Sequence, residues 1–173
     1  MILRNEQNQI NKALSLISVP TNGLALDIAS GVGHSTFLMP VTKTFVSMDF
    51  SFGMVSIQKR SNKDLLCINA NALRIPLKDN SVDYAQAIGL TEYFQNKELA
   101  LFSLELSNVL KVSGKLLITF TPSSLFGIGR QLVGSKIYLR KKEEIISIFA
   151  KNGFKHIAHF SIYTQGVIVF EKS

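Results

Sequence analysis

The pattern of apolar and polar positions alternates between short apolar runs and longer segments with helical spacing. The short runs predict strands at 24–28, 44–49, 65–69, 82–88, 115–121, 154–160 and 166–171. Apolar residues spaced three and four apart predict helices at 6–19, 51–60, 97–110 and 142–152, and 35–39 begins as a further helix. Strands that alternate with helices indicate a parallel sheet, and the closing pair of strands indicates one antiparallel edge partner.

Residues 24–35 read Leu-Ala-Leu-Asp-Ile-Ala-Ser-Gly-Val-Gly-His-Ser, which predicts a buried strand, a small-residue loop and the start of a helix. This unit is typical of nucleotide-binding sheets. A dinucleotide site places pyrophosphate here, and the carboxylate of Asp27 would repel it. Thr36 also stands where the third glycine of a dinucleotide loop would be. A ligand with an ammonium and a sulfonium, such as S-adenosylmethionine, would instead be favoured by Asp27.

The loop Asp27-Ile28-Ala29-Ser30-Gly31-Val32-Gly33 resembles the acid-x-Gly-x-Gly-x-Gly motif of class I S-adenosylmethionine-dependent methyltransferases. Ala29 replaces the first glycine, a change that is mild at negative φ and costly at positive φ. Residues 70–83, 105–115 and 143–154 resemble later motifs of the same family, so the resemblance extends over 24–172. In the segment 70–83, Asn71 stands where the family has an aspartate that accepts from the adenine amino group; its amide oxygen can still accept.

The resemblance implies one class I methyltransferase domain over 1–173, with a Rossmann-like, doubly wound α/β fold. Its seven strands would be mostly parallel, in the order 3-2-1-4-5-7-6, with an antiparallel final strand. The N-terminal helix would occupy 1–20. The apolar, glycine-containing segment 122–138 is either a substrate lid or a loop packed on the core, and we favour the lid.

Asp49 ends the second predicted strand, at the distance from the glycine loop where one carboxylate accepts from two ribose hydroxyls. We expect Asp27 to serve the ammonium end of the ligand. The resemblance implies S-adenosylmethionine as cofactor, S-adenosylhomocysteine as product, and a cofactor-binding set of Asp27, Ala29, Ser30, Gly31, Gly33, Asp49, Phe50, Met54, Asn71, Ala72 and Ala87.

The sequence assigns no catalytic residue. His34, Glu92 and Tyr93 are candidates near the expected pocket, although an exposed histidine and an aromatic residue in packing are common alternatives. Ala87-Ile88-Gly89-Leu90 lacks the Asn-Pro-Pro-aromatic signature of exocyclic-amine methylases, which disfavours amino groups as acceptors. No cluster of residues has metal-ligand spacing.

Composition narrows the class of protein. The 173 residues carry a formal charge of +7, but the basic residues are spread along the chain, so a nucleic-acid partner is disfavoured. The chain has one cysteine, no apolar run long enough to cross a membrane and a polar N-terminal segment, which together favour a cytoplasmic location. Oligomeric state is left open.

We therefore expect methyl transfer to a small, apolar or aromatic molecule. A non-catalytic S-adenosylmethionine-binding protein and an RNA or protein methyltransferase remain as alternatives. An NAD-dependent enzyme is opposed by Asp27 and Thr36.

Overall fold

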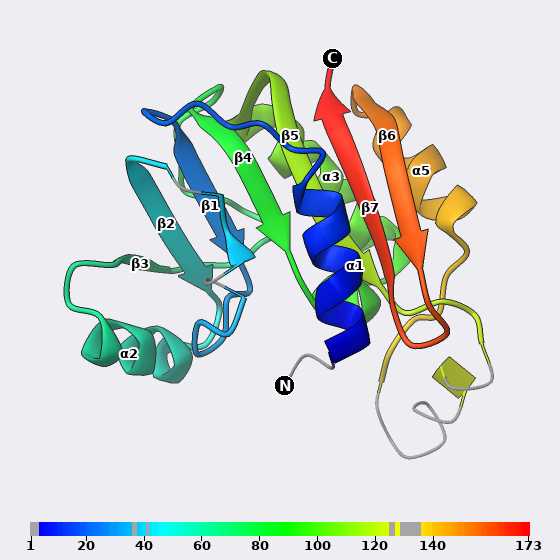
Figure 1. Ribbon diagram of the computed structural model, residues 1–173, viewed down its shortest axis with the longest axis horizontal. Helices are drawn as coiled ribbons and strands as arrows, with labels where there is room; N and C mark the ends of the chain where they lie inside the picture. Colours follow the sequence, from blue (N-terminus) through cyan, green and yellow to red (C-terminus); the bar gives the residue numbers. More distant parts are fainter. Residues whose placement is uncertain (1–3, 36–37, 41, 125–126, 129–135) are drawn as a thin grey trace.

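Seven strands form one sheet in the computed structural model, which describes residues 4–35, 38–40, 42–124, 127–128 and 136–173 (Figure 1). Their order across the sheet is β3-β2-β1-β4-β5-β7-β6. The first five in that order are parallel, and β7 is antiparallel to both of its neighbours. The bounds are β1 Leu24–Ile28, β2 Thr44–Asp49, β3 Leu66–Asn69, β4 Val82–Ala87, β5 Leu110–Phe120, β6 Phe154–Ser161 and β7 Gly166–Lys172. The predicted fold class and strand order are confirmed.

Helices cover both faces of this sheet (Figure 1). α1 (Arg4–Leu14) crosses the front face, where Ile10 and Ala13 pack against the strands. α3 (Asn96–Val109) and α5 (Lys142–Ala150) lie behind it and bury the larger apolar cluster. α2 (Phe52–Ser61) joins β2 to β3, and its N-cap is Ser51. No helix in the described residues combines the length and apolar character needed to cross a bilayer.

The front face of the sheet is apolar under α1 and polar elsewhere. Side chains of a strand point alternately to its two faces, and those that point to the front from β1, β2 and β4 include Asp27, Ser47 and Gln86. All three are fully buried. Because buried polar groups require partners, this part of the face is held by hydrogen bonds rather than by apolar packing.

Two predicted helices differ from the structure. α1 ends at Leu14 rather than at residue 19, because the chain tightens into bonds from Leu16 N to the Ala13 carbonyl (3.1 Å) and from Ile17 N to the Leu14 carbonyl (2.9 Å). Between β1 and β2 the described residues contain turns at 31–35 and no α-helix, while 36 and 37 lie outside the description. Pro40 lacks a backbone donor and so limits any helix begun at residue 35.

β5 begins at Leu110, directly after α3, whereas the sequence predicted a start at 115. Leu110 pairs with Val82, and the register then shifts so that Lys115 pairs with Tyr84. The intervening residues bulge, and Ser113 adopts a positive φ of 64°.

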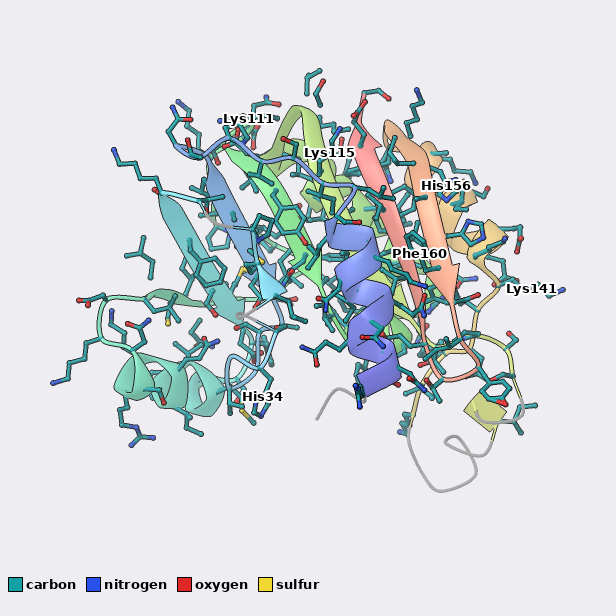
Figure 2. All side chains as sticks on the ribbon, viewed as in Figure 1. His34, Lys111, Lys115, Lys141, His156 and Phe160 are labelled. Atoms are coloured by element: carbon teal, nitrogen blue, oxygen red, sulfur yellow. The ribbon has the colours of Figure 1, made fainter. Side chains whose placement is uncertain are left out.

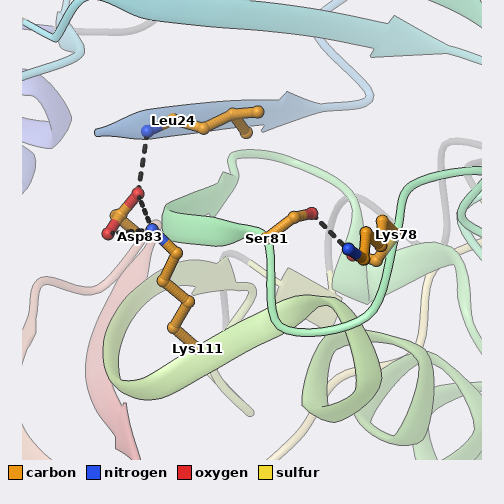
Figure 3. A network of polar contacts seen from close by, with 5 residues as sticks. All are labelled: Leu24, Lys78, Ser81, Asp83 and Lys111. Atoms are coloured by element: carbon orange, nitrogen blue, oxygen red, sulfur yellow. Dashed lines mark hydrogen bonds and ion pairs between the residues drawn. The ribbon is translucent and has the colours of Figure 1, made fainter. Parts of the chain in front are cut away.

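Asp83 of β4 links β1 and β5 to β4 at the end of the sheet where β1 starts (Figure 3). Its Oδ2 accepts from Leu24 N at 2.9 Å, and Lys111 Nζ lies 2.8 Å from Oδ1. Burial alone would raise the pKa of this carboxyl, but the bonds from Lys111 and Leu24 outweigh it and the pKa is lowered. Nearby, Ser81 Oγ donates to the Lys78 carbonyl and closes the turn before β4.

Candidate cofactor and acceptor site

The glycine loop follows β1 at the carboxyl edge of the parallel strands. Ala29, Gly31 and Gly33 have φ values of 56°, 57° and 93°. Ala29 therefore occupies the left-handed region, which costs a non-glycine residue roughly 1–2 kcal/mol. Alanine in place of the family's first glycine therefore strains the backbone of the loop.

Asp49 fastens this loop from the end of β2. Its Oδ2 accepts from Gly31 N at 2.8 Å, and its Oδ1 accepts from Ser51 N at 2.8 Å. The carboxylate thus joins the loop to the start of α2. Each oxygen retains a further lone pair, and the side chain is partly exposed, so Asp49 can also accept from a ligand.

Two cavities open at this edge and share Ala29. The larger cavity has a volume of about 680 Å³, and the smaller cavity about 390 Å³. His34, on the wall of the larger cavity, lies in the lower part of the molecule in Figure 2, while Lys111 and Lys115 lie in the upper part. A crevice at the carboxyl ends of parallel strands is the usual ligand site of such sheets.

Most of the predicted cofactor-binding residues line these cavities. Those on the larger cavity are Ala29, Ser30, Gly31 and Met54, together with the candidates His34, Glu92 and Tyr93. Those on the smaller cavity are Ala29, Asp49, Phe50, Asn71 and Ala72. The structure does not bring Asp27, Gly33 or Ala87 to either lining. The predicted lid at 122–138 falls largely outside the described residues.

Asp27 lies beneath the loop rather than in a cavity. It is fully buried, its Oδ2 accepts from Ser35 Oγ at 2.9 Å, and its Oδ1 accepts from Gln86 Nε2 at 3.1 Å. Tyr84 in turn donates to Gln86 Oε1, and burial together with the Asp27 carboxylate raises the pKa of its hydroxyl well above the ordinary value. In this position Asp27 holds the loop through Ser35.

The charged groups on the two linings are almost all carboxylates. Glu6 and Glu92 line the larger cavity, and Asp49 and Glu98 line the smaller one. No lysine or arginine is among the described lining residues of either cavity. Such a site favours a cationic ligand and opposes a pyrophosphate.

Several lining residues come from elements far away in sequence, and the sequence did not single them out. Glu6 is on α1, Thr121 follows β5, and Thr164 and Gln165 form the turn between β6 and β7. Thr121 follows the carboxyl end of a parallel strand, which is a signal that sequence reasoning could have used. The other three reach the site only through the packing of α1 and the antiparallel strand pair.

Arg140 positions the segment that carries Glu92 and Tyr93. Its side chain is buried and donates to the carbonyls of Thr91 and Phe94 and to Asn96 Oδ1. Glu92 is itself only 7% exposed. The hydrogen bonds from Arg140 therefore hold the segment with Glu92 and Tyr93 in place on the wall of the larger cavity.

A family model described as a methyltransferase domain matches residues 26–118, more than half of the chain. The chain belongs to this methyltransferase domain family. Its matched segment runs from β1 to β5 and includes the glycine loop and most of both linings.

Relatives of the domain include enzymes of quinone biosynthesis. The ubiquinone/menaquinone biosynthesis C-methyltransferase UbiE of Blochmanniella pennsylvanica is 35% identical over 126 residues, covering 66% of this chain and 46% of that protein. The chain spans less than half the length of the curated relatives it matches.

Two solved structures share the fold across nearly the whole chain. The PH0226 protein of Pyrococcus horikoshii superposes with a TM-score of 0.80 at 22% identity, covering 98% of this chain and 91% of that one. Magnesium protoporphyrin IX methyltransferase of Synechocystis, solved with bound S-adenosylhomocysteine, gives 0.76 at 16% identity and covers 100% and 89%.

Proposed function

We propose that this methyltransferase domain binds S-adenosylmethionine across the two cavities and methylates a small, apolar or aromatic molecule. The observation that carries the proposal is the acidic lining around a glycine loop. S-adenosylmethionine has a sulfonium and an ammonium but no phosphate. It therefore suits two cavities that are lined by carboxylates and have no lysine or arginine among their described lining residues. A nicotinamide dinucleotide would bring two phosphates to the same loop.

The smaller cavity suits the adenosine part. Asp49 would accept from the ribose hydroxyls while it holds Gly31 and Ser51. Phe50 presents a ring that is 77% exposed, available to cover a planar base. Asn71 Oδ1 already accepts from Leu73 N at 2.9 Å, and its second lone pair remains for the adenine amino group.

The larger cavity suits the methionine part and the acceptor. S-adenosylmethionine would supply the methyl group and the sulfonium that makes it transferable. The backbone of Ala29, Ser30 and Gly31 would orient the chain of the ligand, and Glu6 and Glu92 supply negative charge on the same wall. Alignment of the two reactants can contribute on the order of 7–11 kcal/mol to such a step.

Glu92 is the residue that we place nearest the acceptor chemistry. It is buried, it lies beside Tyr93 and Phe120 on the larger cavity, and a carboxylate there can take a proton from a hydroxyl. Because the UbiE relative named above is a C-methyltransferase of ubiquinone/menaquinone biosynthesis, a hydroxylated aromatic ring is the first acceptor to test. The cytoplasmic location expected from the sequence stays a prediction.

The test is transfer of a radiolabelled methyl group to a panel of reduced quinones, simple phenols and RNA. We expect labelled aromatic product with the wild type, loss of most turnover in Glu92→Gln, and weaker cofactor saturation in Asp49→Ala. Label on RNA alone would contradict the proposed acceptor class. Binding of S-adenosylmethionine with no turnover on any acceptor would favour the non-catalytic alternative.

A further inference from the structure

A buried polar cluster lies next to the glycine loop. It joins Ser30 of the loop, Ser47 of β2 and Gln58 of α2, whose side chains are 4%, 0% and 3% exposed. Ser30 lines the larger cavity, whereas Ser47 and Gln58 line neither cavity. Ser47 and Gln58 therefore contact the loop at a place where no ligand is expected.

The two contacts that Ser47 makes in this cluster are short. Ser47 Oγ lies 2.5 Å from Gln58 Oε1 and 2.6 Å from Ser30 Oγ. Ser30 Oγ lies 3.4 Å from Gln58 Oε1, and Cys67 Sγ lies 3.8 Å from the same oxygen. Ser30 N also donates to the carbonyl of Met48 at 3.2 Å. The loop is thus tied to β2 and α2 through one serine.

The side-chain oxygen of Gln58 is the centre of the cluster, because Ser30, Ser47 and Cys67 all contact its Oε1. Its Nε2 is buried and has no hydrogen-bond partner among the described residues. Replacing one partner of a buried polar pair destabilises a protein, whereas an apolar replacement of both partners can be neutral or stabilising. The double replacement of Ser47 and Gln58 therefore separates a role in stability from a role in ligand binding.

We propose that Gln58 and Ser47 are positioning residues for the cofactor loop. Ala29 and Gly31 both hold left-handed backbone conformations, with φ of 56° and 57°. Asp49, which lines the smaller cavity, holds Gly31, and the Gln58–Ser47 pair, which lines neither cavity, holds Ser30. Between these two ties the loop keeps the shape that the ligand requires. This inference rests on the proposed binding of S-adenosylmethionine at the loop.

The test compares ligand affinity with stability in wild type, Ser47→Ala, Gln58→Leu and the double variant. Calorimetric titration with S-adenosylhomocysteine should give dissociation constants about three- to tenfold weaker in each single variant. The double variant should lose less than the product of the two single losses, because both residues act through Ser30. Its melting temperature should equal or exceed that of the wild type.

Ser103→Ala is the matched control, since Ser103 is a fully buried serine on α3 that accepts from Asn152 and lies on neither cavity lining. We expect its affinity to stay within about twofold of wild type. Wild-type affinity in both Ser47→Ala and Gln58→Leu would overturn the inference. If Gln58→Leu does not fold, Ser47→Ala alone decides. A wild-type protein that does not bind S-adenosylhomocysteine would overturn the proposed function, and this inference with it.

Discussion

Replacing Ala29 by glycine should stabilise the protein. Ala29 has φ of 56°, where a side chain costs about 1–2 kcal/mol and glycine costs nothing. Glycine also makes the unfolded chain more flexible, which opposes the gain by about 0.4–1 kcal/mol. The midpoints of these two ranges leave a net stabilisation of about 0.8 kcal/mol. For a domain of this size that corresponds to a rise in melting temperature of about 1–4 °C.

Urea unfolding and calorimetric melting measure this effect, and two further variants calibrate it. Ser113→Gly changes another non-glycine residue with positive φ, 64°, far from the cavities, and should also stabilise. Ala100→Gly lies inside α3 and should destabilise by about 1 kcal/mol, the ordinary cost of glycine in a helix. Because Ala29 lines both cavities, Ala29→Gly should bind S-adenosylhomocysteine at least as tightly as wild type.

A loss of stability in Ala29→Gly similar to that in Ala100→Gly would mean that the backbone at Ala29 is one that alanine adopts freely. The strain inferred from the positive φ of Ala29 would then be wrong.

Replacement of Asp49, Asp27 and Asp83 should each have a different effect. Asp49→Ala should weaken S-adenosylhomocysteine about tenfold to a hundredfold in titration calorimetry, because one charged acceptor is lost; an unchanged affinity would remove Asp49 from the site. Asp27→Asn should lower the melting temperature and weaken S-adenosylhomocysteine and adenosine by similar factors, because the buried carboxylate holds Ser35 and Gln86; a loss confined to S-adenosylhomocysteine would instead indicate direct contact with the ammonium. The folded-state pKa of Asp83 is lowered, so its contribution to the free energy of unfolding is present above its unfolded pKa and is lost as pH falls through the folded one. The stability difference between wild type and Asp83→Asn should accordingly be constant near neutral pH and shrink below about pH 4, and a difference that persists in acid would contradict this.

The periodic pattern was sufficient to locate the strands and most helices, because each has an apolar face with its own repeat. The family resemblance supplied the strand order, which spacing alone does not determine. Asp49 could be placed because a strand end and a glycine loop fix its position relative to each other. Glu6 and Gln165 could not be placed, since they reach the larger cavity through long-range packing of α1 and the last two strands.

Two local features could not be determined from the sequence. Asp27 was expected at the ligand because its residue type suits a cation; the sequence did not show that it accepts from Ser35 and Gln86, and its contact with a ligand stays a prediction. A strand position indicates that a residue is buried without showing which partners it finds. The positive φ at Ala29 was stated only as one of two cases, because a sequence does not show backbone sign at a loop residue other than glycine.

Whether this domain binds S-adenosylmethionine rather than a dinucleotide is decided by calorimetric titration of the wild-type protein with S-adenosylhomocysteine and, separately, with NAD. The acidic cavities around the glycine loop predict saturable binding of one S-adenosylhomocysteine per chain and no measurable binding of NAD. Binding of NAD with no binding of S-adenosylhomocysteine would show that the loop holds a dinucleotide instead.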